Sequence, residues 1–204
     1  MIVVGIDEVG RGCWAGPLVA GAVILGEPID GLADSKVLSK AQRIELAEEI
    51  KSKAIAYGLG WVAPAFIDMY GLTTSVQRAM QQALAALNSE YDSVIIDGNY
   101  NYLPNEPKAS FLIKADATIP AVSAASILAK VARDDFMELA AKGFPGYGFE
   151  KHVGYGTKQH LAALQELGVS EIHRKSYKPI RALLDIEIDQ HAKSVKEMGN
   201  HVVN

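Results

Sequence analysis

Length, composition and charge set the first limits on this chain. Its 204 residues suffice for one hydrophobic core of ordinary size, and its formal charge of −4 argues against a nucleic-acid partner. Asp7 interrupts the apolar start, and the apolar run at 13–25 is too short and too rich in Gly and Pro to cross a bilayer. The single cysteine, Cys13, fits a reducing compartment. We therefore expect a soluble, cytoplasmic, monomeric protein with no membrane partner.

Charge is unevenly distributed along the sequence. Residues 142–181 contain seven Lys or Arg and three Glu, a local charge of +4, which leaves −8 for the remainder. A basic C-terminal third can bind a polyanion while metal ions neutralise acids elsewhere. An ordinary solvated surface would give the same pattern, so charge alone leaves both interpretations open.

The N-terminal third predicts three strands. Residues 2–6 and 18–25 are short apolar runs bounded by Gly and Pro, which is typical of buried strands. We expect these two to pair antiparallel through the glycine-rich segment between them. A third strand is predicted at 54–62, broken by Gly58 and Gly60.

Helices are predicted around the third strand. Ser39 and Gln42 form a capping-box pattern at the start of an amphipathic helix. A short helix follows Pro64, and a separate helix begins at Thr74 and ends near Leu87.

The middle of the chain predicts two more strands and a long helix. The strands at 93–96 and 110–113 are each followed by an acidic turn. Pro120 suits the first turn of the helix, whose many alanines favour close packing against a sheet.

The C-terminal part predicts a loop and two helices. Residues 144–157 form a loop rich in Gly and aromatic side chains, and helices are expected at 157–167 and 178–188. Strands interleaved with helices, without an internal repeat, predict an α/β fold with a mixed central sheet flanked by helices.

Acidic residues follow three of the predicted strands. Asp7, Asp97 and Asp116 each come after a short apolar run, and Glu8 adds a fourth acid. Acids are poor strand residues and are costly to bury unless they are paired or bind metal. Adjacent strand ends lie about 5 Å apart, so such carboxylates can reach a shared divalent ion. Alternatively, each acid caps a turn, as Asp-Gly pairs often do.

Asp7 and Glu8 raise a geometric question because consecutive residues of a strand point to opposite faces. Both can serve one site only if the chain leaves strand geometry there. Gly10 and Gly12 follow closely and permit such a turn.

Several short motifs occur in a fixed order along the chain. They are GIDEVGRG at 5–12, DSK at 34–36, IIDG at 95–98, KADA at 114–117 with SAASILAKVARD at 123–134, GYGT at 154–157 and HRKSYKP at 173–179. Together they resemble the type 2 ribonucleases H, the ribonuclease HII family, over residues 5 to about 181. Two departures are Cys13-Trp14 after the GRG motif and KADA in place of KGD. A start at the catalytic strand disfavours the related type 3 enzymes.

The resemblance implies an RNase H-like fold with a C-terminal helical extension. It implies a single catalytic domain over 1–204, in which 142–190 form a basic loop and helical extension that binds substrate and 191–204 form a frayed tail. It also implies a metal-dependent endonuclease that uses two Mg²⁺ or Mn²⁺ ions. Such an enzyme cuts the RNA strand of RNA–DNA hybrids and nicks duplex DNA 5′ of an embedded ribonucleotide. The products carry 3′-hydroxyl and 5′-phosphate ends, as ribonucleotide and primer removal require.

The resemblance also assigns roles to residues. The metal-binding and catalytic acids are Asp7, Glu8, Asp97 and Asp116. Backbone groups of Gly10, Arg11 and Gly12 would check the ribose 2′-hydroxyl, and Tyr155 would sense the junction from ribonucleotide to DNA.

Basic residues are expected to position the phosphate backbone without reading sequence. The candidates are Arg11, Lys36, Lys130, Arg133, Lys151 and Lys175. For Lys130 and Arg133 a solvated helix face is an equal alternative. His173 is a further candidate for a phosphate contact, although the five histidines show no spacing typical of metal ligands.

Two other functional classes remain open from the residues alone. One is a different metal nuclease of the same fold, such as a resolvase or transposase, which the DSK, GYGT and HRKSYKP motifs disfavour. The other is a non-catalytic nucleic-acid binder, in which four clustered acids would only repel the ligand.

Overall fold

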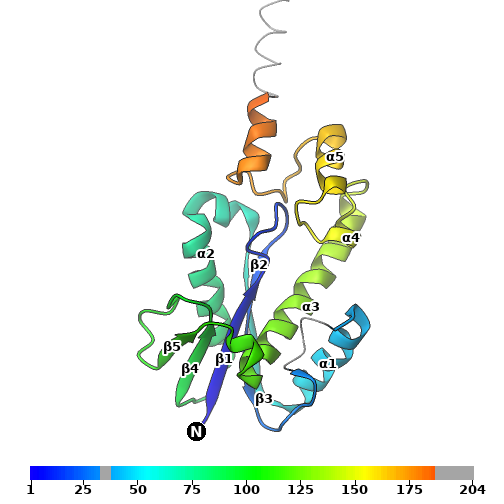
Figure 1. The fold of residues 1–204 in the computed structure, drawn as a ribbon. Coiled ribbons are helices and arrows are strands. Elements are labelled where there is room, and N and C mark those ends of the chain that lie inside the picture. The colour runs from blue at the N-terminus through cyan, green and yellow to red at the C-terminus, as the bar shows by residue number, and fades with distance from the viewer. Residues whose placement is uncertain (33–37, 187–204) are drawn as a thin grey trace, which may run out of the picture.

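A computed structural model describes residues 1–32 and 38–186 (Figure 1). The predicted phosphate contact Lys36 and the predicted tail at 191–204 lie outside these ranges. Five strands form one mixed sheet in the order β3-β2-β1-β4-β5. They are β1 (Val3–Val9), β2 (Leu18–Leu25), β3 (Ala54–Val62), β4 (Ser93–Asp97) and β5 (Ala109–Leu112).

The antiparallel pairing predicted for the first two strands is confirmed. β1 pairs antiparallel with β2, which pairs antiparallel with β3. On its other side β1 pairs parallel with β4, and β4 pairs parallel with β5. The sheet is therefore mixed, and β1 lies at its centre, so the residues of β1 are the best enclosed.

Helices cover both faces of the sheet (Figure 1). α2 packs on one face, while α3 and α1 pack on the other. The helices are α1 (Lys40–Lys53), α2 (Pro64–Ala86), the 3-10 turn η2 (Ala115–Ala117), α3 (Pro120–Gly143), α4 (Phe149–His152) and α5 (Lys158–Leu167). A further helix begins at 178 and is described to 186. Among the described residues no helix is both long and apolar enough to cross a bilayer.

The C-terminal segments gather at one end of the sheet, around a core of their own (Figure 1). Ala15 from the loop after β1 and Met137 from α3 pack there against Phe149, Leu164 and Ile180. The loop after β1 is thus shared between the sheet and the C-terminal segments, so it can be held from both sides.

Several predicted elements are confirmed in type and position. The Ser39–Gln42 capping box starts α1, Pro120 occupies the first turn of α3, and Thr157 accepts a hydrogen bond from the backbone N–H of His160 at the start of α5. The α/β prediction, with a mixed sheet and flanking helices, is also confirmed.

Three details of the prediction are wrong. β1 does not end before Asp7 but continues in regular pairing to Val9. β3 is unbroken, because its glycines admit the helix α2 and do not end pairing. The break inside α2 lies at Gly71, whose φ of 79° lies in the left-handed region, and not at Thr74.

Gly60 shows how closely α2 approaches the sheet. A Cβ added at Gly60 would lie 1.9 Å from the carbonyl oxygen of Ala79, closer than any non-bonded contact allows. Gly58 meets the oxygen of Ala83 in the same way, at 2.3 Å. The small residues therefore set the distance between helix and sheet.

Gly60→Ala should destabilise the protein by about 1–3 kcal/mol, because the backbone of α2 must move away from β3. The measurement is the free energy of unfolding from urea titration. Gly143→Ala is the control, since an added Cβ there meets nothing within 4 Å, and it should not lower stability. Equal stabilities for the two variants would contradict the close-packing account.

Candidate active site

Three of the predicted acids meet at one edge of the sheet. The parallel register places Ile6 of β1 beside Ile96 of β4, so Asp7 and Asp97 are the next residues on neighbouring strands. The backbone N–H of Asp116, in η2, donates to Asp97 Oδ1 at 3.4 Å. Three acids that are far apart in the sequence thus lie close together, as predicted from their common position after short apolar runs.

Asp7 and Glu8 lie on opposite faces of β1. Ile6 belongs to the apolar core under α2, so Glu8, two residues on, projects to the same side. Asp7 faces α3 instead, where the nearby Ser126 side chain partly offsets the rise of its pKa. The expectation that the chain leaves strand geometry at this point is wrong, because Glu8 pairs regularly with Ala20.

Only one of the two carboxylate oxygens of Glu8 has a hydrogen-bond partner among the described residues. Its Oε1 accepts a hydrogen bond from Arg11 Nη1 at 3.0 Å. This ion pair links the GRG motif (residues 10–12) to the acids. Its Oε2 is buried without a hydrogen-bond partner among the described residues. A buried carboxylate oxygen left unpaired is costly, and a bound cation would remove that cost.

Electrostatics at this edge favour a cation. Burial, followed by the neighbouring charge of Glu8, raises the pKa of Asp7 to about 8. Burial also raises the pKa of Glu8, although Arg11 opposes that shift. Like charges in a poorly solvated place raise one another's pKa, and a divalent ion reverses this effect.

The acidic side chains are suitable ligands for a divalent metal, but they are not arranged around a single ion position in this structure. Carboxylate oxygens are the ligands that Mg²⁺ and Mn²⁺ prefer. Within residues 1–32 and 38–186, no three His, Cys, Asp or Glu side chains are arranged to hold a single ion as they stand. Mutual repulsion keeps uncompensated carboxylates apart, so the side chains would have to turn inward around a cation.

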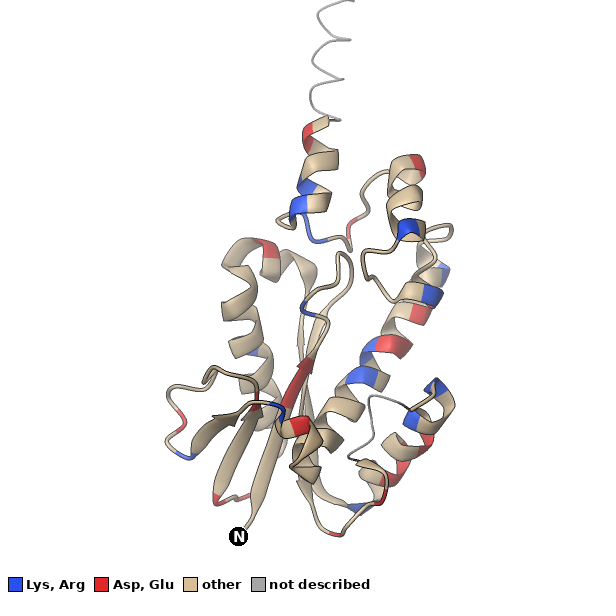
Figure 2. Ribbon diagram, in the orientation of Figure 1, with Lys and Arg blue, Asp and Glu red and all other residues tan. Residues whose placement is uncertain are grey.

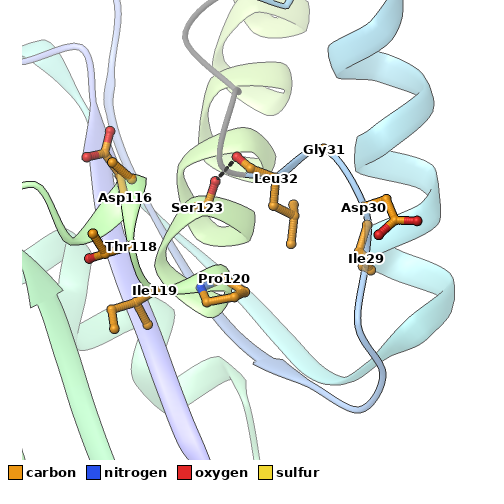
Figure 3. A pocket seen from close by; sticks show the side chains of 10 residues that line it. Ile29, Asp30, Gly31, Leu32, Asp116, Thr118, Ile119, Pro120 and Ser123 are labelled. Carbon is orange, nitrogen blue, oxygen red and sulfur yellow. Dashed lines mark hydrogen bonds between the residues drawn. The ribbon is translucent and has the colours of Figure 1, made fainter.

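A pocket of about 190 Å³ lies next to the acids (Figure 3). Asp116 and Thr118 line one side of it, and Ile29 and Asp30 line the other. At its back the Ser123 hydroxyl donates to the carbonyl of Leu32. Asp116 is the only one of the four acids among the residues that line the pocket, so the pocket adjoins the candidate site and does not contain it.

The GRG motif forms a turn directly after β1. Gly10 has a φ of +92°, and an added Cβ would lie 2.4 Å from Arg133 Nε, so only glycine fits there. Gly12 is exposed, and an added Cβ would meet nothing within 4 Å. The turn is therefore fixed at its first glycine and open to a ligand at its second.

Arg133 holds the loop after β1 from the side of α3. It is fully buried and donates to the carbonyl oxygens of Ala15, Pro17 and Val153. The prediction of a phosphate contact or a solvated helix face is therefore wrong for this arginine. Its guanidinium is used for backbone carbonyls that would otherwise be buried unpaired.

Arg174 holds the same loop from the C-terminal side. It is also fully buried and donates twice to the carbonyl of Gly16 and once to that of Arg11. The Tyr177 hydroxyl donates to the Arg11 carbonyl as well. The backbone of the GRG motif is thus anchored on its inner side, which leaves Gly12 available to solvent.

Tyr155 lies beside the GRG turn. Tyr155 is 40% exposed, and the residue before it, Gly154, accepts a hydrogen bond at 2.8 Å from the backbone N–H of Trp14, two residues after the motif. Lys130 places its ammonium 5.8 Å from the ring centre and forms an ion pair with Asp134 at 2.9 Å. The structure therefore brings the predicted junction sensor next to the predicted sugar-checking turn.

The other predicted phosphate contacts are at separate places. Lys151 on α4 and Lys175 in the loop before residue 178 are exposed, and Figure 2 shows Lys and Arg spread over this end of the molecule. His173 is buried, so the prediction that it meets a phosphate is wrong. The hydrogen-bond partners of its ring are the His160 ring and the backbone N–H and hydroxyl of Ser170.

The role of Arg174 and the burial of His152, His160 and His173 were not predicted from the sequence. Arg174 and His173 belong to the HRKSYKP motif, whose place among the ordered motifs marked it as important but did not indicate what its side chains contact. The partners of Arg174 are backbone carbonyls, which every residue has, so no acidic side chain in the sequence indicates where this arginine binds. Its role became visible only through the loop that it supports.

Asp7→Asn should raise the stability of the metal-free protein at alkaline pH. A folded-state pKa of about 8, above the ordinary 3.8, means that the contribution of Asp7 to stability is fully present below about pH 4 and is lost as pH rises through about 8. In EDTA at pH 9 the variant should therefore be more stable than the parent by at least about 1 kcal/mol, and the gain should shrink toward pH 5.

Urea unfolding at the two pH values measures this difference. The exposed carboxylate of Asp185, replaced in the same way, is the control and should change stability by less than about 0.5 kcal/mol. A gain for Asp7→Asn that is independent of pH would contradict the raised pKa of Asp7.

The comparisons with known proteins agree with this geometry. The family model of ribonuclease HII matches residues 4–180. Ribonuclease HII of Bacillus cytotoxicus is 48% identical over 184 residues, which make up 89% of this chain and 70% of the relative.

Two solved structures are similar at 27% identity. Ribonuclease H2 from Pyrococcus horikoshii OT3 gives a TM-score of 0.77 and covers 90% of this chain and 97% of its own. Ribonuclease HII from Archaeoglobus fulgidus, solved as a complex with PCNA, gives 0.76 and covers 87% and 96%. Since the family match spans most of the chain, this protein belongs to the ribonuclease HII family and is a type 2 ribonuclease H.

Proposed function

We propose that this ribonuclease H is a metal-dependent endonuclease that both hydrolyses the RNA strand of RNA–DNA hybrids and nicks duplex DNA 5′ of an embedded ribonucleotide. Its products would carry 3′-hydroxyl and 5′-phosphate ends, and its roles would be ribonucleotide removal and primer removal. The observation that carries this proposal is one short segment, in which Asp7 and Glu8 run directly into a glycine turn, and Trp14 just after that turn is hydrogen-bonded to Gly154, the neighbour of Tyr155. Cleavage and sugar recognition would thus be adjacent.

Four acids would hold the metal ions. Asp7, Asp97 and Asp116 lie together on the α3 side of the sheet edge, and Glu8 would join them from the other face. The ribonuclease H family depends on divalent metals, and carboxylates suit Mg²⁺ or Mn²⁺. When bound, two such ions supply an activated water and relieve charge on the departing 3′ oxygen. Arg11 would release Glu8 Oε1 for this purpose, since it is the exposed partner of that ion pair.

Sugar recognition would come from the backbone. Gly12 leaves open space where a Cβ would stand, so the N–H and C=O groups of the turn can approach a ribose closely. The 2′-hydroxyl is both donor and acceptor, and it distinguishes RNA from DNA. Arg133 and Arg174 would hold this backbone still and so lower the entropy lost on binding.

Phosphate contacts would position the duplex. Lys151 and Lys175 are exposed, and Lys36 would add a contact from outside the described residues. Such contacts carry no sequence information, which suits an enzyme that reads the sugar and not the base.

A three-substrate assay tests the proposal. A duplex with one ribonucleotide, a continuous hybrid and an all-DNA duplex are each incubated with the enzyme and Mg²⁺. The first two should be cut, and Asp7→Asn should lose nearly all cutting because one ligand charge is removed at constant volume. Cleavage of DNA alone would indicate a different nuclease, and binding without any cleavage would indicate a non-catalytic binder.

Tyr155 should matter most at a single ribonucleotide. We expect its ring to pack on the deoxyribose that follows the ribonucleotide, where a ribose would bring an extra hydroxyl against it. Tyr155→Ala should therefore reduce kcat/KM on the single ribonucleotide more than on the continuous hybrid. Tyr155→Phe keeps the ring and should lose only about 0.5–1.5 kcal/mol, the value of one neutral hydrogen bond. Equal losses on both substrates for Tyr155→Ala would mean that the ring merely supports its loop.

A further inference from the structure

Three histidine rings are buried together behind Tyr155, and the proposed mechanism does not use them. His152 comes from α4, His160 from α5 and His173 from the HRKSYKP motif, and their exposed fractions are 8%, 0% and 1%. The rings of His152 and His160 stack with centres 4.5 Å apart. His160 Nε2 lies 3.0 Å from His173 Nε2, within hydrogen-bond distance.

The partners of these rings determine where each proton lies. The backbone N–H of Ser170 donates to His173 Nδ1 at 3.0 Å, and the Ser170 hydroxyl, 2.7 Å from the same nitrogen, can donate to it as well. With Nδ1 as an acceptor, the proton of His173 is on Nε2. That Nε2–H then donates to His160 Nε2. The proton of His160 is therefore on Nδ1, which donates to the carbonyl oxygen of Tyr155 at 2.9 Å.

The third histidine, His152, also contacts the backbone of the Tyr155 loop, at Gly154. The N–H of Gly154 points at His152 Nδ1 at 3.3 Å, and His152 Nε2 lies 2.8 Å from the carbonyl of Tyr147. Backbone groups of two consecutive residues, the Gly154 N–H and the Tyr155 carbonyl, are thus held by imidazole rings.

The surroundings of His160 and His173 favour the neutral form of the pair. A second proton on His160 would face the Nε2–H of His173, and a second proton on His173 would face the N–H of Ser170 and find only the Ser170 hydroxyl as an acceptor. Burial lowers the pKa of both rings to about 4, and the other histidines oppose their charging further. Tyr147, which packs 5.2 Å from His173, faces the cluster as well. The pair is therefore neutral at physiological pH.

The segment that carries His173 also holds the glycine turn. Arg174, the next residue, donates to the carbonyls of Arg11 and Gly16. Its backbone N–H bonds to the carbonyl of Trp14, and Ala15 pairs with His173. One short segment thus contacts the glycine turn directly and is linked to Tyr155 through His160.

We propose that His160 and His173 are positioning residues, which act as a hydrogen-bonded relay from the glycine-turn anchor to the carbonyl of Tyr155. The relay sets the distance between the Tyr155 ring and the GRG turn, and so sets how strongly the enzyme favours a ribonucleotide that is followed by DNA. This inference rests on the proposed role of Tyr155 at the junction and assigns that role two supporting side chains. Neither histidine touches the substrate.

Two substitutions of His160 separate positioning from simple packing. His160→Phe keeps a ring but removes the donor to the Tyr155 carbonyl. His160→Asn keeps a donor near the position of Nδ1 and loses ring volume. Leu161→Ala, on the same helix with a partly exposed side chain, is the control.

The measurement is the ratio of kcat/KM on a single embedded ribonucleotide to kcat/KM on a continuous hybrid. His160→Phe should lower this ratio by about 3- to 10-fold, the value of one lost hydrogen bond, and His160→Asn should lower it less. Adding Tyr155→Ala to His160→Phe should lower the ratio no further than Tyr155→Ala alone, because both act through the same ring. An equal loss on the two substrates for His160→Phe, or independent effects in the double variant, would overturn the relay.

Tyr155→Ala by itself tests the proposed function separately. If it leaves the ratio unchanged, junction sensing by Tyr155 is wrong. If it changes the ratio while His160→Phe does not, the relay alone is wrong. Nitrogen-15 NMR of the histidine rings at pH 7 gives a readout that needs no substrate. The relay requires the proton on Nδ1 of His160 and on Nε2 of His173, and any other tautomer pair overturns it.

Discussion

The candidate site depends on two buried guanidinium groups that hold one loop. Arg133, from α3, and Arg174, from the HRKSYKP motif, donate to carbonyls of the loop between β1 and β2 from opposite sides. A loop with inward carbonyls would be unstable without such donors, because each unpaired carbonyl buried in apolar surroundings costs free energy. The arginines satisfy several carbonyls each and tie the loop to two separate parts of the chain. Removing either would leave buried acceptors unpaired as well as a cavity.

This arrangement lets a short glycine-rich turn be both tight and rigid. Glycines loosen a backbone, since they have more conformations to lose than other residues. Here Gly10 uses its freedom to pass Arg133 closely, and the Arg11 carbonyl is held by Arg174 and Tyr177. What remains free is the outer side of the turn at Gly12. A backbone fixed in this way can recognise a small group such as a hydroxyl with little loss of entropy on binding.

Sequence patterns predicted the elements well where local signals and burial agree. The capping box at Ser39 and the proline at the start of α3 place helix starts where the structure has them, and the apolar runs predict all five strands, although β1 is longer than predicted. The meeting of Asp7, Asp97 and Asp116 followed from their common position after apolar runs. The errors arose where a contact with a distant part of the chain gives a residue a role that its local sequence does not indicate. Glycines in β3 looked like breaks but admit α2, and Arg133 looked like a surface cation but is a buried donor.

The edge that carries the acids is rigid in its backbone and adjustable in its side chains. A Cβ on Gly5 would lie 2.1 Å from the backbone of Ala121, so β1 and the start of α3 are in direct contact just before Asp7. The strand therefore cannot move away to relieve repulsion among buried carboxylates. Burial, together with that repulsion, raises the pKa of Asp7, and Glu8 Oε2 is left without a hydrogen-bond partner among the described residues. Because the backbone is already fixed, a cation bound at the proposed site would have only to reorient side chains, and most of the free energy gained by neutralising charge would be available for binding.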